Sequence, residues 1–276
     1  MTTPLLTIDP EKCSKDGLCA MACPMALLSF ADTTKPPVPV PNARELCIRC
    51  GHCVAVCPKG AIDHEAMKAS DCLPIQKKLL LSAEHAEHFL RSRRSIRNYK
   101  DAPVEREKLE RLITIASHAQ TGHNEQPVKW LVIYEKEKVH QLAEQVIAWM
   151  KHLLKTQKEF AKALHMDMIV AAWLMGFDVV FRNAPHVVLA YSHKASATAP
   201  TASIIAMTYL ELAAPTLGLG TCWAGYFTYA SQTFPPLMEA LNLPKNHVAQ
   251  QGVMVGIPKF GYQRMPVRKS PDITFA

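Results

Sequence analysis

The chain has 276 residues and a formal net charge of +7 at pH 7, and 49% of its residues are hydrophobic. This length is enough to bury a full core, so one large domain or two unequal domains are expected. Residues 1–72 carry seven basic and eight acidic side chains, so the positive charge resides in the rest, which holds 24 basic and 16 acidic ones. The basic side chains are scattered and accompany no nucleic-acid-binding motif, which argues against a nucleic-acid partner.

Cysteine content and the N-terminus indicate a reducing compartment. There are nine cysteines, and the first residues contain neither a basic segment nor a long apolar one. The two most apolar windows, 169–181 and 204–219, are interrupted by Asp178 and by Glu211 with Pro215. Both therefore predict buried helices and not membrane spans. We expect a cytoplasmic protein with no membrane partner.

Two cysteine groups of the same spacing occur in the first 60 residues. They read Cys-Ser-Lys-Asp-Gly-Leu-Cys-Ala-Met-Ala-Cys-Pro from Cys13 and Cys-Ile-Arg-Cys-Gly-His-Cys-Val-Ala-Val-Cys-Pro from Cys47. The second group has the pattern of a bacterial ferredoxin, in which three thiolates hold one iron–sulfur cluster and the fourth reaches a second cluster. Zinc sites usually use two separated cysteine pairs, and four cysteines this close together would make poor disulfides. The internal repeat therefore predicts two clusters.

In this pattern each cluster is held by the first three ligands of one group and the last cysteine of the other group, which we call the crossed rule. The rule assigns the cysteines to two sets. One cluster is expected on Cys23, Cys47, Cys50 and Cys53, and the other on Cys13, Cys19 and Cys57. Asp16 occupies the position of the missing cysteine. It either supplies the fourth ligand, or leaves an open corner in a three-iron cluster, or is an ordinary turn residue before Gly17. The prediction is one 4Fe-4S cluster and a second that is 4Fe-4S or 3Fe-4S with Asp16 at the fourth position.

The remaining chain alternates between helical and extended patterns. A segment rich in Pro and Thr, 31–41, predicts an extended connector, and residues 64–80 predict a linker. Apolar periodicity predicts helices over 82–94, from 103 onward, over 139–154 and over 202–217. It predicts strands over 130–134, 186–192 and 253–256. The expected fold is an α+β domain around a sheet.

Four arginines surround one hydroxyl at the end of the first of these helices: Arg91, Arg93, Arg94 and Arg97 around Ser95. Guanidinium groups and a hydroxyl suit a phosphate monoester, although a solvated basic face has the same composition. The chain has no Gly-x-Gly-x-x-Gly and no Gly-Lys-Ser loop, so neither a Rossmann site nor a P-loop is predicted.

Four segments together resemble the FMN-dependent nitroreductase family. In chain order they are Arg-Arg-Ser-Ile-Arg-Asn-Tyr at 93–99, Pro-Val at 103–104, Gly-His-Asn-Glu-Gln-Pro at 122–127 and Gly-Leu-Gly-Thr-Cys-Trp-Ala-Gly at 218–225. With the cysteine repeat, the chain resembles the iron–sulfur nitroreductases over nearly its whole length. The resemblance implies a small ferredoxin-like region over residues 1–70, followed by a nitroreductase-like FMN-binding α+β domain over residues 71–276.

The resemblance also implies which residues bind FMN. Those matching the segments for the phosphate and ribityl chain, including a basic tail, are Arg93, Arg94, Ser95, Arg97, Arg268 and Lys269. Those matching a loop that reaches the flavin of the other subunit are Gln120, Thr121, Gly122 and Asn124. Those matching the segment beside the isoalloxazine ring are Trp223, Ala224 and Gly225, with a backbone N–H near Gly225 facing N5.

Two features of the flavin loop bear on the chemistry. Val128 and Lys129 follow Pro127, where many family members have Trp directly after the Pro, so the stacking around the ring is expected to differ, with Trp130 as a substitute. His118 and His123 are candidate proton donors near the flavin, although a loop histidine is more often a hydrogen-bonding or surface residue. No other catalytic side chain is expected, because the flavin carries the chemistry in such enzymes.

As a function, the resemblance implies an FMN- and iron–sulfur-dependent oxidoreductase that forms a homodimer with FMN at the interface. Electrons would pass from reduced ferredoxin or NAD(P)H through the clusters and flavin to a nitroaromatic, a quinone or a similar electron-poor small molecule. Two alternatives stay open. One is a reductase or dehalogenase for a specific metabolite on the same fold, and the other is an electron-transfer relay protein.

Overall fold

The computed structural model describes residues 4–276 and divides into two compact units. Unit 1 consists of residues up to Leu80 together with His123–Glu125, and unit 2 consists of Leu81–Gly122 and Gln126–Ala276. The unit boundary falls ten residues after the predicted domain boundary at residue 70, at the end of an exposed segment. None of the helices in residues 4–276 is long and apolar enough to cross a lipid bilayer.

Unit 1 is built from short elements. They are β1 (Leu6–Ile8), α1 (Leu18–Met21), β2 (Leu28–Ser29), β3 (Val38–Pro39), α2 (Ala43–Leu46), α3 (His52–Val56), β4 (Ile62–His64) and the 3-10 helices η1 (Ala69–Asp71) and η2 (Lys77–Leu79). Strand β1 pairs antiparallel with β4, and β2 pairs antiparallel with β3, which lies in the predicted extended connector. The apolar core consists of two clusters with three buried residues each, so it is small.

Unit 2 is organised around one antiparallel sheet with the strand order β5-β6-β8-β7. The strands are β5 (Lys129–Ile133), β6 (His186–His193), β7 (Gly220–Trp223) and β8 (His247–Gly256). The helices are α4 (Ala83–Ser92), α5 (Arg106–Ala116), α6 (Lys136–Thr156), α7 (Lys158–Ala163), α8 (Met166–Leu174), α9 (Ala199–Ala213), α10 (Gly225–Thr233) and α11 (Pro235–Leu241). Two 3-10 turns, η3 (Gly122–Asn124) and η4 (Ala214–Leu217), complete the elements.

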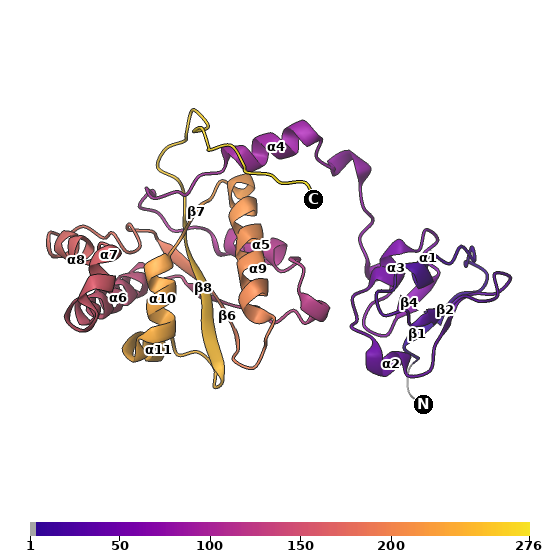
Figure 1. Ribbon diagram of the computed structural model, residues 1–276. Helices are drawn as coiled ribbons and strands as arrows, with labels where there is room; N and C mark the ends of the chain where they lie inside the picture. Colours follow the sequence, from indigo (N-terminus) through magenta and orange to yellow (C-terminus); the bar gives the residue numbers. More distant parts are fainter. Residues whose placement is uncertain (1–3) are drawn as a thin grey trace. The chain divides into compact units, whose positions relative to one another are not determined.

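Helices cover both faces of this sheet. Along β6, Val187 and Leu189 belong to a core formed with α6, while Val188 and Ala190 belong to a core formed with α5 and α9. Successive side chains of a strand point to opposite faces, so the continuous apolar run of β6 is buried on both faces of the sheet. Figure 1 shows α5 and α9 on one side of the sheet, and α6, α10 and α11 on the other. The predicted α+β class is confirmed.

The expectation of one buried helix over residues 169–181 is wrong. Helix α8 ends at Leu174, and Leu174, Met175 and Phe177 are exposed. Gly176 has a φ of 85°, a left-handed conformation that glycine adopts at little cost. A residue in this conformation ends the helix. Beyond it, the Asp178 carboxylate accepts hydrogen bonds from the amides of residues 181 and 183, which turns the chain toward β6.

The arginine-rich segment after α4 lies against the β7 end of the sheet. The Ile96 amide donates to the Thr221 carbonyl at 2.8 Å, and Tyr99 forms a bridge with Pro258 beyond β8. A Cβ on Gly220 would lie 2.5 Å from Cγ1 of Ile96, closer than van der Waals contact allows. Only glycine permits this approach, which holds Arg97 beside β7.

Candidate functional site

The two cysteine loops of unit 1 have the same backbone conformation. Lys15 and Arg49 have φ values of 55° and 53°, and Gly17 and Gly51 have values of 71° and 74°. Helices α1 and α3 begin directly after these glycines. Left-handed residues at matching positions aim the side chains between them in matching directions. Asp16 therefore occupies the backbone position that corresponds to that of Cys50.

A cavity in unit 1 is lined by four cysteines, Cys23, Cys47, Cys50 and Cys53. Burial raises the pKa of the Cys53 thiol to about 11, and the nearby thiols of Cys50 and Cys23 act in the same direction. Leu5, Leu27 and Leu28 contribute an apolar wall. These four cysteines are the set predicted for one cluster, and an apolar cavity with four sulfurs fits an iron–sulfur cluster.

The other predicted set also lies together. Burial raises the pKa of the Cys19 thiol, with smaller effects in the same direction from Cys57 and Cys13. Among residues 4–276, no group of three His, Cys, Asp or Glu side chains is arranged to hold a single metal ion. The thiolates of a cluster bind different irons, so they need not converge on one point.

Each half of unit 1 has a backbone amide that donates to a cysteine sulfur. The Leu27 amide lies 3.3 Å from the Cys23 Sγ, and the Ala61 amide lies 3.2 Å from the Cys57 Sγ. A further group, Nε2 of His64, lies 3.5 Å from the Cys47 Sγ. His64 was not predicted from the sequence, because it lies outside both cysteine motifs. Burial lowers the pKa of the His64 ring, an effect larger than the opposing charge of Glu65.

Asp16 is exposed, and both of its carboxylate oxygens accept hydrogen bonds. Ser14 Oγ donates to one at 2.7 Å, and the Leu18 amide donates to the other at 3.0 Å. The Ser14 bond is the largest cause that lowers the pKa of Asp16. These are the bonds of a turn residue at a helix start. Its role as a cluster ligand stays a prediction.

In unit 2, Arg93 forms an ion pair that joins α4 to α9. Its guanidinium donates to Glu211 Oε1 at 2.7 Å, and Trp223 Nε1 donates to Glu211 Oε2 at 3.0 Å. Glu211 is buried. It is the only charged residue between Lys194 and Glu239, a signal in the sequence that was interpreted only as an interruption of an apolar run. The pair links the predicted phosphate segment to the predicted ring segment.

Arg94 is turned toward the backbone. Its two terminal nitrogens donate to the carbonyls of Arg93 and Arg91 at 2.7 and 2.6 Å, at the C-terminus of α4. Its buried Nε finds no acceptor among residues 4–276. Arg91, Arg93 and Arg94 line a cavity of about 530 Å³ with the predicted tail residues Arg268 and Lys269. The tail is therefore close to the arginine segment, and the orphaned Nε suits an anionic group.

A second cavity of unit 2, of about 510 Å³, is lined by Arg97 and the three predicted ring residues Trp223, Ala224 and Gly225. Arg182, which was not predicted from the sequence, lines it too. No side chain among the described residues caps the N-terminus of α10, and a Cβ at Gly225 would meet no atom within 4 Å. Helix N-termini present free N–H groups and a positive dipole.

Cys222 also lines this cavity. Burial raises the pKa of Cys222, opposed by the charges of Arg97 and Arg182 and by a hydrogen bond with Ser95. This places Ser95 and the two arginines near one point of β7. Cys222 is buried and belongs to the core on the α6 face of the sheet.

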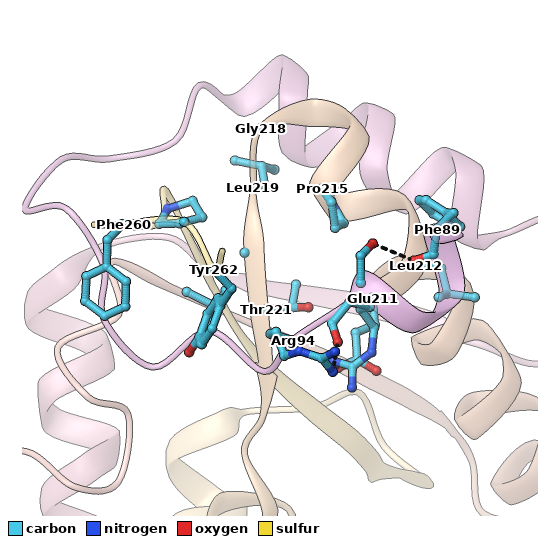
Figure 2. Close-up of a pocket in the computed structure, with 16 residues that line it drawn as sticks. Phe89, Arg94, Glu211, Leu212, Pro215, Gly218, Leu219, Thr221, Phe260 and Tyr262 are labelled. Carbon is cyan, nitrogen blue, oxygen red and sulfur yellow. Dashed lines mark hydrogen bonds and ion pairs between the residues drawn. The ribbon is translucent and has the colours of Figure 1, made fainter. Parts of the chain in front are cut away.

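The third cavity lies between α4, α9 and the C-terminal segment (Figure 2). Among the lining residues labelled in Figure 2 are Phe89, Arg94, Glu211, Thr221 and Tyr262. Its volume is about 270 Å³, below the range of about 300–1,000 Å³ common for ligand pockets, whereas the other two lie within that range.

The predicted flavin loop has an unusual backbone. His123, Asn124 and Gln126 all have positive φ values near 50°. Tyr209 OH donates to Gln120 Oε1 at 3.1 Å, and Thr121 Oγ1 accepts from the Gln126 amide at 3.1 Å. Within unit 1, Asn124 Nδ2 donates to the Arg49 carbonyl at 3.0 Å. Gly122 and His123 are exposed. The loop residues make these contacts within one chain, and their predicted contact with a partner's flavin stays a prediction.

Arginines around one cavity, an adjoining backbone N-terminus and an orphaned guanidinium nitrogen fit a flavin mononucleotide. The anionic phosphate suits the cavity lined by Arg94, Arg268 and Lys269, beside the Arg93–Glu211 pair, and the ring suits the cavity at Trp223–Gly225. The predicted FMN contacts are therefore distributed over two cavities, one for the phosphate end of FMN and one for its ring.

Comparison with known proteins gives two family matches. Residues 90–257 match the nitroreductase family, and residues 11–62 match a 4Fe-4S dicluster domain. A protein of Archaeoglobus fulgidus, named an NADH dehydrogenase/NAD(P)H nitroreductase, is 26% identical over 176 residues, which cover 64% of this chain and 87% of that protein.

Solved structures show the same fold at low identity. A nitroreductase with bound FMN from Bacteroides fragilis has a TM-score of 0.58 at 18% identity, covering 69% of this chain and 97% of that one. A BluB-like flavoprotein from Clostridium difficile has a TM-score of 0.55 at 20% identity, covering 67% and 94%. Iodotyrosine deiodinase bound to FMN and 3-iodo-L-tyrosine has a TM-score of 0.52 at 20% identity, covering 69% and 98%. The chain belongs to the nitroreductase family of oxidoreductases and carries a 4Fe-4S dicluster domain ahead of its nitroreductase domain.

Proposed function

We propose that this protein binds FMN and two iron–sulfur clusters and passes electrons from a reduced donor to a nitroaromatic, a quinone or a similar electron-poor acceptor. The observation that carries the proposal is the coexistence of two sites in one chain. Unit 1 has a cavity lined by four cysteines, and unit 2 has an arginine-lined cavity against the N-terminus of α10.

FMN, when bound, supplies the exchange between one-electron and two-electron chemistry. The protein supplies binding and charge. Arg97 and Arg182 hold positive charge at the cavity, which favours an anionic ligand. The free N–H groups at the start of α10, which begins at Gly225, would offer hydrogen-bond donors to the ring. Glu211, paired with Arg93, accepts from the Trp223 indole and orients it.

We further infer a homodimer in which the loop Gln120–Asn124 of one protomer reaches the flavin of the other. A symmetric pair would use the same loop twice, as isologous interfaces do. The left-handed residues of this loop support the proposal, because strained backbone persists where a fixed shape is needed. His118 and His123 are exposed in the chain and stay candidate proton donors.

For the second cluster we propose Cys13, Cys19 and Cys57 as ligands, with Asp16 at the fourth position. The matching backbone at Asp16 and Cys50 supports this proposal, although the present hydrogen bonds of Asp16 would have to be exchanged for iron. Iron quantification and EPR of the oxidised protein separate a three-iron from a four-iron cluster.

The test of the proposed function begins with anaerobic purification and quantification of iron and FMN. The flavin absorbance is then followed as NADH, NADPH or reduced ferredoxin is added. Two clusters are redundant if a nicotinamide can reduce the flavin directly, so we expect bleaching by a one-electron donor. Rapid bleaching by NAD(P)H would indicate that the clusters accept electrons from the reduced flavin, to store them or pass them on. Absence of FMN after reconstitution would refute the proposal.

The acceptor is tested separately with a panel of nitroaromatics, quinones and halogenated aromatics. A nitro- or quinone reductase should turn over several members of the first two groups. A dedicated reductase or dehalogenase should instead favour one compound strongly in kcat/KM. A relay protein should turn over none of them quickly and form a stable complex with a protein partner.

A further inference from the structure

His64 is the last residue of β4 and is buried, with 4% of its surface exposed. Its ring lies between two groups of unit 1. On one side, Nδ1 is 2.9 Å from the Ala66 amide nitrogen. On the other, Nε2 is 3.5 Å from the Cys47 Sγ, within hydrogen-bonding range for the larger sulfur atom.

The first contact determines the direction of the second. A backbone amide can only donate, so Nδ1 must accept and carries no proton. The neutral ring has its single proton on the other nitrogen. Nε2 is therefore the donor, and the bond points from the His64 ring to the Cys47 sulfur.

The repeat offers no counterpart in the other half. His64 lies seven positions after Cys57, and the residue seven positions after Cys23 is Phe30. The Phe30 ring packs over Gly17, so closely that a Cβ added to this glycine would lie 2.5 Å from a ring carbon. Phenylalanine has no polar hydrogen to donate. The backbone N–H···S bonds at Cys23 and Cys57 are matched, so His64 is an additional donor to one set of cysteines alone.

Reduction of an iron–sulfur cluster adds one electron, and the added charge spreads onto the thiolate sulfurs. A hydrogen bond to such a sulfur stabilises the reduced form more than the oxidised form, which raises the reduction potential. The proton stays on Nε2 throughout, so one electron moves and no proton does.

We propose that His64 is a positioning and tuning residue, whose N–H···S bond to Cys47 raises the reduction potential of the cluster on Cys23, Cys47, Cys50 and Cys53 and leaves the other cluster unaffected. The inference rests on the proposed function only in that clusters assemble on the predicted cysteines. It gives the two sites of the repeat different affinities for the electron.

The test uses two substitutions in the full-length protein, purified anaerobically. His64→Asn keeps an oxygen near the Nδ1 position for the Ala66 amide but is too short to reach Cys47. His64→Gln extends its amide nitrogen to the Nε2 position and restores an N–H donor. Redox titration with dithionite and mediators, followed by EPR, gives the midpoint potential of each cluster.

In the Asn variant we expect the midpoint potential of one cluster to fall by about 59 mV, which corresponds to a tenfold change in the equilibrium constant for one-electron reduction. The second cluster should keep its midpoint, and the Gln variant should stay close to the wild type. Unchanged midpoints in the Asn variant, or equal shifts in both clusters, would overturn the inference.

A measurement on the unsubstituted protein covers the case in which the Asn variant does not retain iron. With ¹⁵N-labelled histidine, pulsed EPR of the reduced protein should detect a nitrogen coupled to one cluster, and His64→Gln should remove that signal. The absence of such a coupling contradicts the inference. If the wild-type protein binds no cluster at all, it is the proposed function that fails, and iron quantification reveals this before any titration.

Discussion

Arg93 and Arg97 are four positions apart and have different surroundings. Arg93 is partly buried and paired with Glu211, whereas Arg97 is exposed at the edge of the cavity that contains Trp223. The first arginine already has a partner in the protein, and the second is available to a ligand. Their replacement should therefore have different effects.

Arg97→Ala should raise the Kd for FMN about tenfold, because Arg97 lines the ring cavity and a charge-assisted hydrogen bond to a bound ligand contributes roughly 1.4 kcal/mol. The free energy of unfolding should change by less than about 0.5 kcal/mol. Titration of apo-protein with FMN, followed by flavin fluorescence, measures the affinity. Arg111→Ala, on the exposed face of α5, is the matched control and should leave the Kd unchanged. An unaltered Kd in the Arg97 variant would remove it from the site.

Arg93→Ala should lower the free energy of unfolding by about 2 kcal/mol. It leaves the Glu211 carboxylate without its charge partner, and fully buried pairs cost about 3–5 kcal/mol when broken in this way. The Arg93 side chain is 25% exposed, which reduces the expected value. Adding Glu211→Gln should restore at least half of the loss, since Gln is neutral and still accepts from Trp223. Urea denaturation of the four proteins of this cycle gives the result. Additive losses would contradict the pairing.

The sequence predicts the cysteines and arginines of the two sites because these residues belong to short motifs. Glu211, Arg182 and His64 were missed, because each joins a site through the fold. Arg93 and Glu211 are 118 positions apart, and their pairing depends on how α4 and α9 pack. No local pattern can encode a contact of that separation.

At the scale of elements, the long periodic segments were predicted well. The helix predicted over 139–154 is part of α6, in which Val139, Leu142, Val146, Met150 and Leu153 are buried. Strand β6 is one residue longer than the predicted strand over 186–192. The short helices α7, α10 and α11 were missed, since six to nine residues hold too few turns to show a period. Strand β8 starts at His247 and not at Val253, because its first half includes the polar Gln250 and Gln251 at a bulge.

His186, the first residue of β6, joins three elements. Its Nε2 accepts from the Val104 amide at 2.8 Å, its Nδ1 donates to the Tyr134 carbonyl at 2.7 Å, and its ring stacks on Tyr134. The bond from the Val104 amide requires an unprotonated Nε2 and therefore the neutral ring. Burial lowers the pKa of His186, an effect larger than the opposing hydrogen bond to Tyr134.

The free energy of unfolding should therefore fall as pH decreases below about 6.5, the ordinary pKa of histidine. In that range the unfolded chain binds a proton that the folded chain does not, with a slope of at most about 1.4 kcal/mol per pH unit. Above about pH 6.5 this contribution is fully present. Urea denaturation between pH 5.5 and 7.5 measures the effect. His186→Gln should be less stable at pH 7.5 and show a weaker dependence, whereas the exposed His140→Gln should match the wild type.

At the scale of the whole molecule, the two units differ in how much apolar core they contain. Unit 1 has two clusters of three buried residues each, while unit 2 has two large cores on either face of its sheet. A unit of this size with so little core usually depends on metals or other cross-links. The stability of unit 1 should come from its clusters, and that of unit 2 from its sheet.

Removal of the clusters by oxidant and chelator should unfold unit 1 and leave unit 2 folded. Hydrogen exchange followed by mass spectrometry should show lost protection in residues 4–80, including the Leu27 and Ala61 amides that donate to sulfur. Peptides from β6 and β8 should keep theirs. Anaerobic reconstitution with iron and sulfide is the control and should restore protection. Retained protection in iron-free unit 1 would show that its small core suffices.

The matching loops of unit 1 have one more consequence. Lys15 and Gly17 have the φ values of Arg49 and Gly51, so a cysteine in place of Asp16 would find the main chain already in the shape that Cys50 adopts. Asp16→Cys should change the iron stoichiometry or lability of one corner without moving the backbone. The natural and substituted chains would then form an isomorphous pair, in which the chemistry of a single cluster vertex is varied while every other part of the enzyme is held constant.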